Sequence, residues 1–339
     1  MSNFQDLPDE LVLRTLRSSE TKDLISWGQV SRRIRTISHD SSLWIKVNLE
    51  KKIVKTELLE MILSKGCQNL NMSNSKIVGS LSLKEESQLR VLDISKSSWA
   101  WPPCSGNMEC LEQILFSCRS LQELKMDCLL LTRAMAISIC KNGKTLQKLN
   151  LNYSVVKKYN DGIHGGVYSP SSGFGSNAYL QEIIKCCQQL REIDFNGSDE
   201  GLTSEDLKFL VENISPNIEK LNLKSSCYLD EFASELVKVL LIRCNKIKSF
   251  SLMARFISVS VLTNIRQHLH LTLEELSLGC GFEFLSLNGF LELKSMPRLK
   301  ILNLYNRKAD TGVQTLREHL PHLKIHGIQN QFCLHPIYS

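Results

Sequence analysis

Long apolar runs are missing from the sequence, and their absence sets the first limit on its function. Nowhere do about eighteen apolar residues follow one another, which is roughly the length that a membrane-spanning helix needs. The first residues, Met1 to Asp9, also lack the basic segment and the apolar segment that together mark a secretory signal. The sequence therefore predicts a soluble, intracellular protein that is not a membrane protein.

An excess of one charge is missing as well. The 41 Lys and Arg residues stand against 35 Asp and Glu residues, which leaves a net charge of only +6 over 339 residues. Nucleic-acid-binding domains usually concentrate much more positive charge on one face. We therefore do not expect nucleic acid as a partner.

The sequence contains few of the motifs that carry catalysis or metal binding. It has no G-x-S-x-G or H-E-x-x-H motif and neither of the two common glycine-rich phosphate-binding motifs. Its twelve cysteines include no C-x-x-C pair, so we expect no metal, no cofactor and no catalytic residue. Cys118, Cys187 and Cys244 each stand three residues before a recurring apolar motif, which predicts small buried side chains.

That recurring motif is L-x-x-L-x-L, the strand signature of leucine-rich repeats. Eight clear copies begin at Leu89, Leu121, Leu146, Leu190, Ile218, Ile247, Leu273 and Leu299. Weaker copies begin at Trp44, Cys67 and Leu320. The starts of the clear copies lie 25 to 32 residues apart, except for an interval of 44 residues after Leu146. Repeats of this length predict a helix after each strand.

The segments between the strands have the apolar spacing of helices. The clearest examples are Leu111-Ile114-Leu115, Leu180-Ile183-Ile184, Leu207-Leu210-Val211 and Leu236-Val239-Leu240. The predicted fold is therefore α/β, a leucine-rich-repeat solenoid of the horseshoe type over residues 49–325. The long interval contains a Gly- and Ser-rich inserted loop at about 157–178, and residues 326–339 form a C-terminal tail.

One polar column runs along the predicted strands. Because side chains alternate, the residue between the last two apolar positions faces away from the core. This column reads Asp93, Lys125, Asn150, Asp194, Asn222, Ser251, Ser277 and Asn303. A solenoid face of this kind commonly binds a protein, although such residues can also simply be solvated. The candidate substrate-binding residues are Lys125, Asn150, Asp194, Asn222, Lys224, Arg255 and Tyr305.

The first 48 residues do not fit the repeat and instead predict a small all-α motif. Helices are expected over Leu11 to Leu16, with Pro8 at the start, and over Leu24 to Arg35. A third short helix is expected where Ser41-Ser42 lead into Leu43-Trp44. So few apolar residues would give the motif only a weakly stable core on its own. The motif therefore either docks on a partner or caps the end of the solenoid.

This segment resembles an F-box, whose pattern is L-P-x-E-[LI], two further apolar positions, a second helix that ends V-C-[KR]-x-W, and a closing L-W. The matching residues are Leu7, Pro8, Glu10, Leu11, Leu13, Leu16, Leu24, Val30, Arg32, Leu43 and Trp44. Two positions depart from the pattern, with Ser31 in place of Cys and Ile34 in place of Trp. The resemblance implies binding to the S-phase-kinase-associated adaptor, and through it to cullin and RING subunits. The implied contact residues are Leu7, Pro8, Leu11, Leu13, Leu16, Leu24, Val30, Ile34, Leu43 and Trp44.

An F-box ahead of such repeats is similar to the F-box/leucine-rich-repeat family, and most of all to its S-phase-kinase-associated branch. The resemblance implies a non-catalytic substrate receptor of an SCF-type ubiquitin ligase that acts in nucleus and cytoplasm. A phosphorylated cell-cycle regulator would be the substrate, with a small cyclin-kinase accessory subunit as a further partner. The family's phosphate-reading residues do not carry over, because Gly197, Cys227 and Cys280 occupy those positions. The alternative is a leucine-rich-repeat scaffold without a ligase role.

Overall fold

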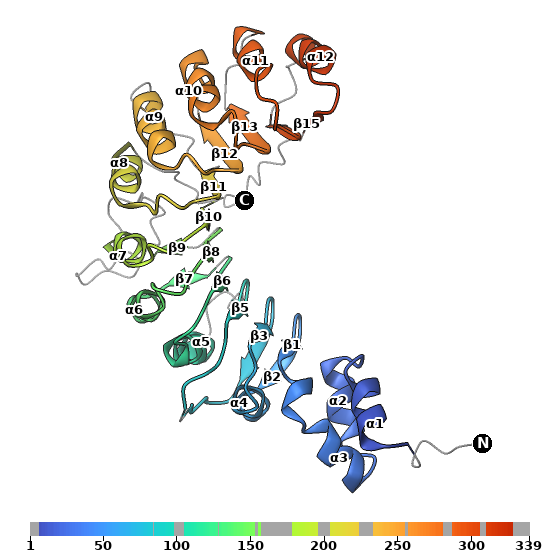
Figure 1. Ribbon diagram of the computed structural model, residues 1–339. Coiled ribbons are helices and arrows are strands. Elements are labelled where there is room, and N and C mark those ends of the chain that lie inside the picture. The colour runs from blue at the N-terminus through green and yellow to red at the C-terminus, as the bar shows by residue number, and fades with distance from the viewer. Residues whose placement is uncertain are drawn as a thin grey trace, which may run out of the picture. The chain divides into compact units, whose positions relative to one another are not determined.

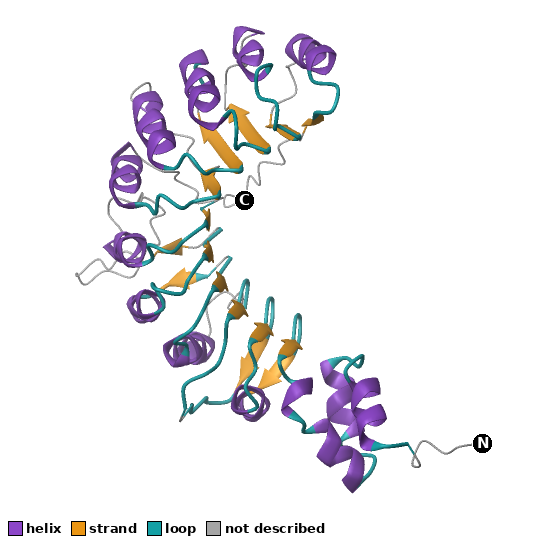
Figure 2. Cartoon of the chain, viewed as in Figure 1, coloured by secondary structure: helices purple, strands orange, loops and turns teal. Residues whose placement is uncertain are grey.

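The protein folds into two compact units of strands and helices. The computed structural model describes residues 7–83, 85–97, 105–127, 129–152, 155–156, 178–195, 204–223, 233–254, 257–280, 287–305 and 310–327. The first unit comprises Met1–Leu129 and Ile137–Leu146, and the second comprises Leu130–Ala136 and Gln147–Ser339. In each unit parallel strands alternate with helices (Figures 1 and 2). The predicted α/β leucine-rich-repeat fold is confirmed.

Three short helices begin the first unit. They are α1 (Asp9–Leu16), α2 (Thr21–Trp27) and α3 (Arg32–Ser38), followed by the 3₁₀ helix η2 (Ser41–Leu43). α3 packs against both α1 and α2. The small core that they enclose consists of Val12, Leu16, Leu24, Ile34, Ile37, Leu43 and Trp44.

The prediction of one continuous helix from Leu24 to Arg35 is wrong. The chain leaves the helix after Trp27, and the amide of Val30 bonds to the carbonyl of Trp27 in a turn. Ser31 then begins α3, because its hydroxyl accepts a hydrogen bond from the amide of Ile34 at 3.2 Å. Serine is favoured at this position because it satisfies an amide that the first helical turn leaves unpaired.

The sheet of the first unit contains four parallel strands. These are β1 (Lys46–Asn48), β3 (Asn69–Asn71), β5 (Val91–Asp93) and β6 (Glu123–Lys125). Their central residues, Val47, Leu70, Leu92 and Leu124, lie opposite one another and are buried. Two helices accompany the strands, α4 (Thr56–Ser64) and α5 (Ser105–Ser117). The weaker motif copies at Trp44 and Cys67 therefore correspond to real strands, β1 and β3.

The first three strands of this sheet end in the same turn. The last side chain of each strand accepts a hydrogen bond from the amide two residues further on; the three residues are Asn48, Asn71 and Asp93. Asn and Asp are common turn residues because their side chains can make this bond. Three residues beyond, the backbone takes the left-handed conformation, at Lys51, Asn74 and Lys96. Polar residues at these strand ends therefore have a structural role.

Two further pairs of short parallel strands were not predicted from the sequence. One pair is β2 (Ile53–Lys55) with β4 (Lys76–Val78), in the first unit. The other is β7 (Leu130–Leu131) with β9 (Val155–Val156), in the second. Strands of two or three residues are too short to show a distinct periodicity.

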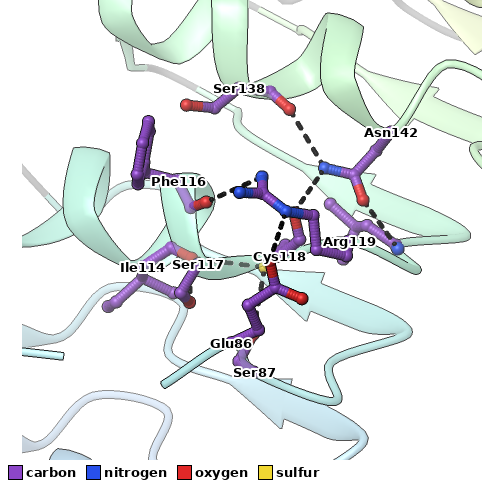
Figure 3. A network of polar contacts seen from close by, with 10 residues as sticks. Glu86, Ser87, Ile114, Phe116, Ser117, Cys118, Arg119, Ser138 and Asn142 are labelled. Carbon is purple, nitrogen blue, oxygen red and sulfur yellow. Dashed lines mark hydrogen bonds and ion pairs between the residues drawn. The ribbon is translucent and has the colours of Figure 1, made fainter. Parts of the chain in front are cut away.

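A buried asparagine ties neighbouring repeats together in the first unit (Figure 3). Asn142 follows α6 (Arg133–Lys141), and its Nδ2 donates to the carbonyls of Cys118 at 3.1 Å and Ser138 at 3.0 Å. Its Oδ1 accepts from the amide of Leu121 at 3.0 Å. Both amide protons and the oxygen of this buried side chain are thus paired, as a buried amide requires.

The second unit continues the pattern with longer strands. Its main sheet runs β8 (Lys148–Asn150), β10 (Glu192–Asp194), β11 (Lys220–Leu223), β12 (Ser249–Ala254), β13 (Glu275–Cys280), β14 (Ile301–Tyr305) and β15 (Lys324–Gly327). The helices lie along one side of it (Figure 2). They are α7 (Ala178–Cys186), α8 (Ser204–Asn213), α9 (Ala233–Arg243), α10 (Val259–Leu269), α11 (Leu287–Leu293) and α12 (Asp310–His319).

The core of the second unit follows the predicted apolar positions. Each strand from β8 to β14 contributes one central residue to a continuous buried row, made of Leu149, Ile193, Leu221, Phe250, Leu276 and Leu302. The helix face predicted for Leu236-Val239-Leu240 is wrong by one position, since Val237, Leu240 and Leu241 are buried and Val239 is exposed. This helix carries apolar residues on all sides, so its spacing alone does not select the inner face.

Three sequence predictions about smaller features have different outcomes. Cys118, Cys187 and Cys244 are fully buried, as predicted. The inserted loop at about 157–178 lies outside the described residues apart from Ala178, where α7 begins. The predicted tail begins with two residues that belong to β15, and residues 328–339 lie outside the described part of the chain.

Candidate functional site

The residues predicted to contact an adaptor fall into two groups in the structure. Five of them are buried within the helical motif: Leu16, Leu24, Ile34, Leu43 and Trp44. They contact one another across α1, α2 and α3, where burial of large apolar side chains supplies most of the stability. In this conformation their role is to build the motif, and a partner would not reach them.

The other group is accessible. Val30 is 66% exposed in the turn before α3, and Leu11 is 47% exposed on α1. Pro8 is exposed, while Leu7 and Leu13 are half-buried. Ile25 on α2 is also exposed and was missed by the sequence analysis. Its position next to the buried Leu24 was the available signal, because adjacent residues on a helix point in different directions.

An ion pair holds the start of this surface in place. The guanidinium of Arg33 on α3 donates to Asp9 Oδ1 with its Nε at 2.8 Å, and also contacts the carbonyl of Leu7. Both charged side chains are partly exposed, so their pairing contributes little to stability. Its effect is to keep Leu7 and Pro8 against α3.

The candidate substrate residue of the first unit is already paired. Lys125 ends β6, and its Nζ lies 3.1 Å from Glu123 Oε1. These two residues are two positions apart on one strand, so they share a face. The positive charge of Lys125 is therefore partly neutralised within the protein itself.

In the second unit the predicted polar column is not uniformly exposed. Asn150 and Asp194 are half-buried, and Asn150 uses its Oδ1 to accept the amide of Asn152 at 3.0 Å. Asn222 is only 7% exposed, and Ser277 only 1%. A position on the face away from the core therefore does not make every residue of the column accessible, because short side chains in the middle of a sheet are covered by their neighbours. Lys224, Arg255 and the side chain of Tyr305 lie outside the described residues.

The residues at the first strand position form a second polar row on the same face. In register from β8 to β13 this row reads Lys148, Glu192, Lys220, Ser249 and Glu275. Lys148 pairs with Glu192 at 2.8 Å, and the hydroxyl of Ser249 donates to Glu275 at 3.1 Å. Lys220 is exposed and forms no ion pair with any described residue. Lys220 is not among the candidate substrate-binding residues selected from the sequence, although it occupies the same repeat position as Lys148.

Alternating charges precede these strands. This row consists of Arg191, Glu219, Lys248, Glu274 and Lys300. Glu219 lies 2.6 Å from Lys248 and 3.5 Å from Arg191, and Glu274 lies 2.6 Å from Lys300. The hydrogen bond from Lys248 lowers the pKa of Glu219, and that from Lys300 lowers the pKa of Glu274. The strand face of the second unit thus offers both signs of charge in a fixed pattern.

Among the described residues, no group of three or more His, Cys, Asp or Glu side chains is placed to hold a metal ion. In the same part of the chain, no helix is both long and apolar enough to cross a bilayer.

A helical motif with exposed apolar residues, followed by leucine-rich repeats with a polar strand face, defines a class of protein-binding receptor. Two family models match this chain: one described as "SKP2 LRR domain" over residues 57–334, and one described as "F-box-like" over residues 4–50. Since the first covers more than half of the sequence, the chain belongs to the F-box/leucine-rich-repeat family of the SKP2 type.

Membership of this family carries a general function. An F-box implies binding to an Skp1-type adaptor and thereby to the SCF complex. An F-box joined to SKP2-type repeats supports a role as a substrate receptor of that ligase. Members of the family are typically non-catalytic.

Proposed function

We propose that this chain recruits a protein substrate to an SCF-type ubiquitin ligase and docks on the adaptor through Leu11, Ile25 and Val30. One observation carries the proposal. Most apolar residues of the F-box close its small core, whereas these three remain exposed on α1, on α2 and in the turn before α3. Several large apolar side chains exposed on one small motif indicate a protein-binding surface.

The size of the expected contribution supports this assignment. Burying one Leu, Ile or Val side chain against a partner is worth about 1.5–3 kcal/mol. The half-buried Leu7 and Leu13 and the exposed Pro8 lie near Leu11 in sequence and would extend the contact. The five buried residues of the predicted set act indirectly, by holding the helices that present the surface.

The substrate is proposed to lie over the strand face of the second unit, from β8 to β14. Lys220 is central to this proposal because its charge has no carboxylate partner within the described residues. A carboxylate or phosphate of the substrate would gain a charge-assisted hydrogen bond there. The ion-paired side chains near Lys220 would repel a partner that places charges of the same sign against them.

The finer features of the family resemblance belong to the same proposal. The substrate would be a phosphorylated cell-cycle regulator, with a small cyclin-kinase accessory subunit assisting its capture. Lys224 and Arg255 stay in the proposed site as further cations. Ubiquitylation of such a substrate would take place in the nucleus and cytoplasm.

The adaptor contact is tested by co-precipitation of the purified chain with an Skp1-type adaptor and cullin. We expect Leu11→Asp or Val30→Asp each to weaken retention at least about tenfold, because a charge would replace a buried aliphatic group. Leu271→Asp is the matched control, since Leu271 is 60% exposed in the second unit and lies outside the F-box. Wild-type retention by both F-box variants would place adaptor docking elsewhere on the chain. No retention by the wild type would favour a scaffold without a ligase role.

The substrate contact needs a separate test. Proteins captured by the chain in its adaptor complex are compared for the wild type, Lys220→Glu and Lys208→Glu. Lys208 is an exposed lysine on α8, so its reversal changes net charge equally without touching the strand face. Loss of a ubiquitylated protein from the Lys220 variant alone supports the proposed site. The same loss from both variants would point to a non-specific charge effect.

A further inference from the structure

A small two-stranded sheet in the first unit carries a surface that the adaptor and substrate contacts do not use. β2 and β4 pair in parallel, with Ile53 opposite Lys76 and Lys55 opposite Val78. The alternate residues, Val54 and Ile77, are buried. The four outward residues Ile53, Lys55, Lys76 and Val78 therefore share one face, which we call the β2–β4 patch.

The apolar residues of this patch are unusually exposed for their size. Ile53 is 76% exposed, more than any other large apolar residue found exposed in the described part of the chain, and Val78 is 44% exposed. Leaving an isoleucine in water forgoes about 1.5–3 kcal/mol of possible burial. Nothing in the packing of β2 requires an apolar residue at position 53.

The charges of the patch have one sign. Lys52 and Lys51 precede β2, so that four exposed lysines lie on or beside the patch. Lys51 pairs with Glu50 at 2.8 Å. Lys52, Lys55 and Lys76 form no ion pair with a described residue. Lysine is common on sheet edges because it discourages unwanted pairing, but that explanation leaves the exposed Ile53 unexplained.

One end of the patch packs closely against α4. Gly79 follows β4 with φ +113°, and a Cβ at this position would lie only 2.3 Å from Thr56 Oγ1. The end of β4 therefore sits directly against the first residue of α4.

We infer that the β2–β4 patch binds an extended, acidic segment of a partner protein that carries apolar side chains. An extended segment presents every second side chain on one face. Apolar and acidic residues alternating on that face would match the alternation of Ile53 with Lys55, and of Lys76 with Val78. The patch is far smaller than the ~800 Å² that each partner contributes to a standard folded interface, which favours a short segment. This inference does not depend on the ligase role.

The probe is a fluorescein-labelled peptide in which Leu and Glu alternate at every second position, with Ser between them. Its binding to the full chain is measured by fluorescence anisotropy. We expect Lys55→Glu/Lys76→Glu to weaken binding about tenfold, and added salt to weaken it as well. Ile53→Ser should also weaken binding, and this highly exposed site lets the fold remain intact. Lys208→Glu/Lys246→Glu, in the second unit, should leave binding unchanged.

Several outcomes would overturn the inference. One is equal binding of a peptide that carries Lys in place of Glu. The others are no binding of the acidic peptide, and unchanged peptide binding by the patch variants. A further arm uses vesicles of phosphatidylserine and phosphatidylcholine, because basic and apolar residues together can also contact an anionic membrane. Patch-dependent binding to vesicles without binding to the peptide would assign the surface to lipid instead.

Discussion

The indole Nε1 of Trp44 donates a hydrogen bond to the carbonyl oxygen of Ser38 at 2.8 Å, and both residues are buried. This bond joins the end of α3 to the start of the first repeat strand. It explains why the closing L-W of the motif matters even though Trp44 is not accessible. The tryptophan fixes the geometry of the F-box from within.

Trp44→Ala is expected to unfold the helical motif, with a loss of about 3–5 kcal/mol, because it removes a large buried side chain. Leu11→Ala, at an exposed position, should change the free energy of unfolding by less than about 0.5 kcal/mol. Urea denaturation followed by tryptophan fluorescence and circular dichroism measures both. An equally mild effect of Trp44→Ala would show that the buried ring is not required for folding.

The buried amide of Asn142 supports a second prediction. Asn142→Ala leaves the carbonyls of Cys118 and Ser138 and the amide of Leu121 without their partner. Since each unpaired buried polar group costs about 1–3 kcal/mol, a loss of several kcal/mol is expected. Thermal denaturation tests this. Asn245→Ala is the comparison, since Asn245 is exposed; an equal loss in both variants would contradict a special role for Asn142.

The repeat strands could be predicted from the sequence because their signal is repeated. Even the weak copies at Trp44, Cys67 and Leu320 correspond to strands, since each leucine position must fill the same place in the core. The break between α2 and α3 was missed, although Ser31 gave the local signal of a helix start. From the sequence, Ser31 was interpreted only as a departure from the F-box pattern, so its role as the N-cap of α3 was not recognised.

The candidate sites were harder to predict, because exposure depends on neighbouring elements. Leu11 and Leu16 match the F-box pattern equally well, yet only Leu11 is accessible. Asn222 and Ser277 are polar and stand at the expected strand position, but neighbours cover them. The strand register places Glu192 beside both Lys148 and Lys220, and only the side-chain positions show that Glu192 pairs with Lys148.

Gly79 gives a prediction about backbone strain. Gly79→Ala should destabilise the first unit by about 1–3 kcal/mol, because φ +113° disfavours any side chain. The new Cβ would also contact Thr56. Thr56→Ala in the same chain should recover part of the loss by removing that contact, and the double-mutant cycle measures the coupling. Gly327→Ala, where no atom lies within 4 Å of the new Cβ, should be nearly neutral. Equal effects at both glycines would contradict the explanation.

The adjacent Cys186 and Cys187 allow a prediction about pH. Cys186 is exposed, whereas burial, followed by the neighbouring Cys186, raises the pKa of the Cys187 thiol from about 9 to about 12. The folded chain thus holds this proton more tightly than the unfolded chain. Below pH 9 both states keep the proton and stability is unaffected. Between pH 9 and 12 the unfolded chain loses the proton first, so the free energy of unfolding falls.

One proton of difference corresponds to a slope of about 1.4 kcal/mol per pH unit. Urea denaturation between pH 8 and pH 10.5 should therefore show a shallower loss of stability for Cys187→Ala than for the wild type. Native-state alkylation with iodoacetamide should likewise modify Cys186 and spare Cys187, because the reaction requires an accessible thiolate. Equal alkylation of the two would show that the Cys187 position opens to solvent.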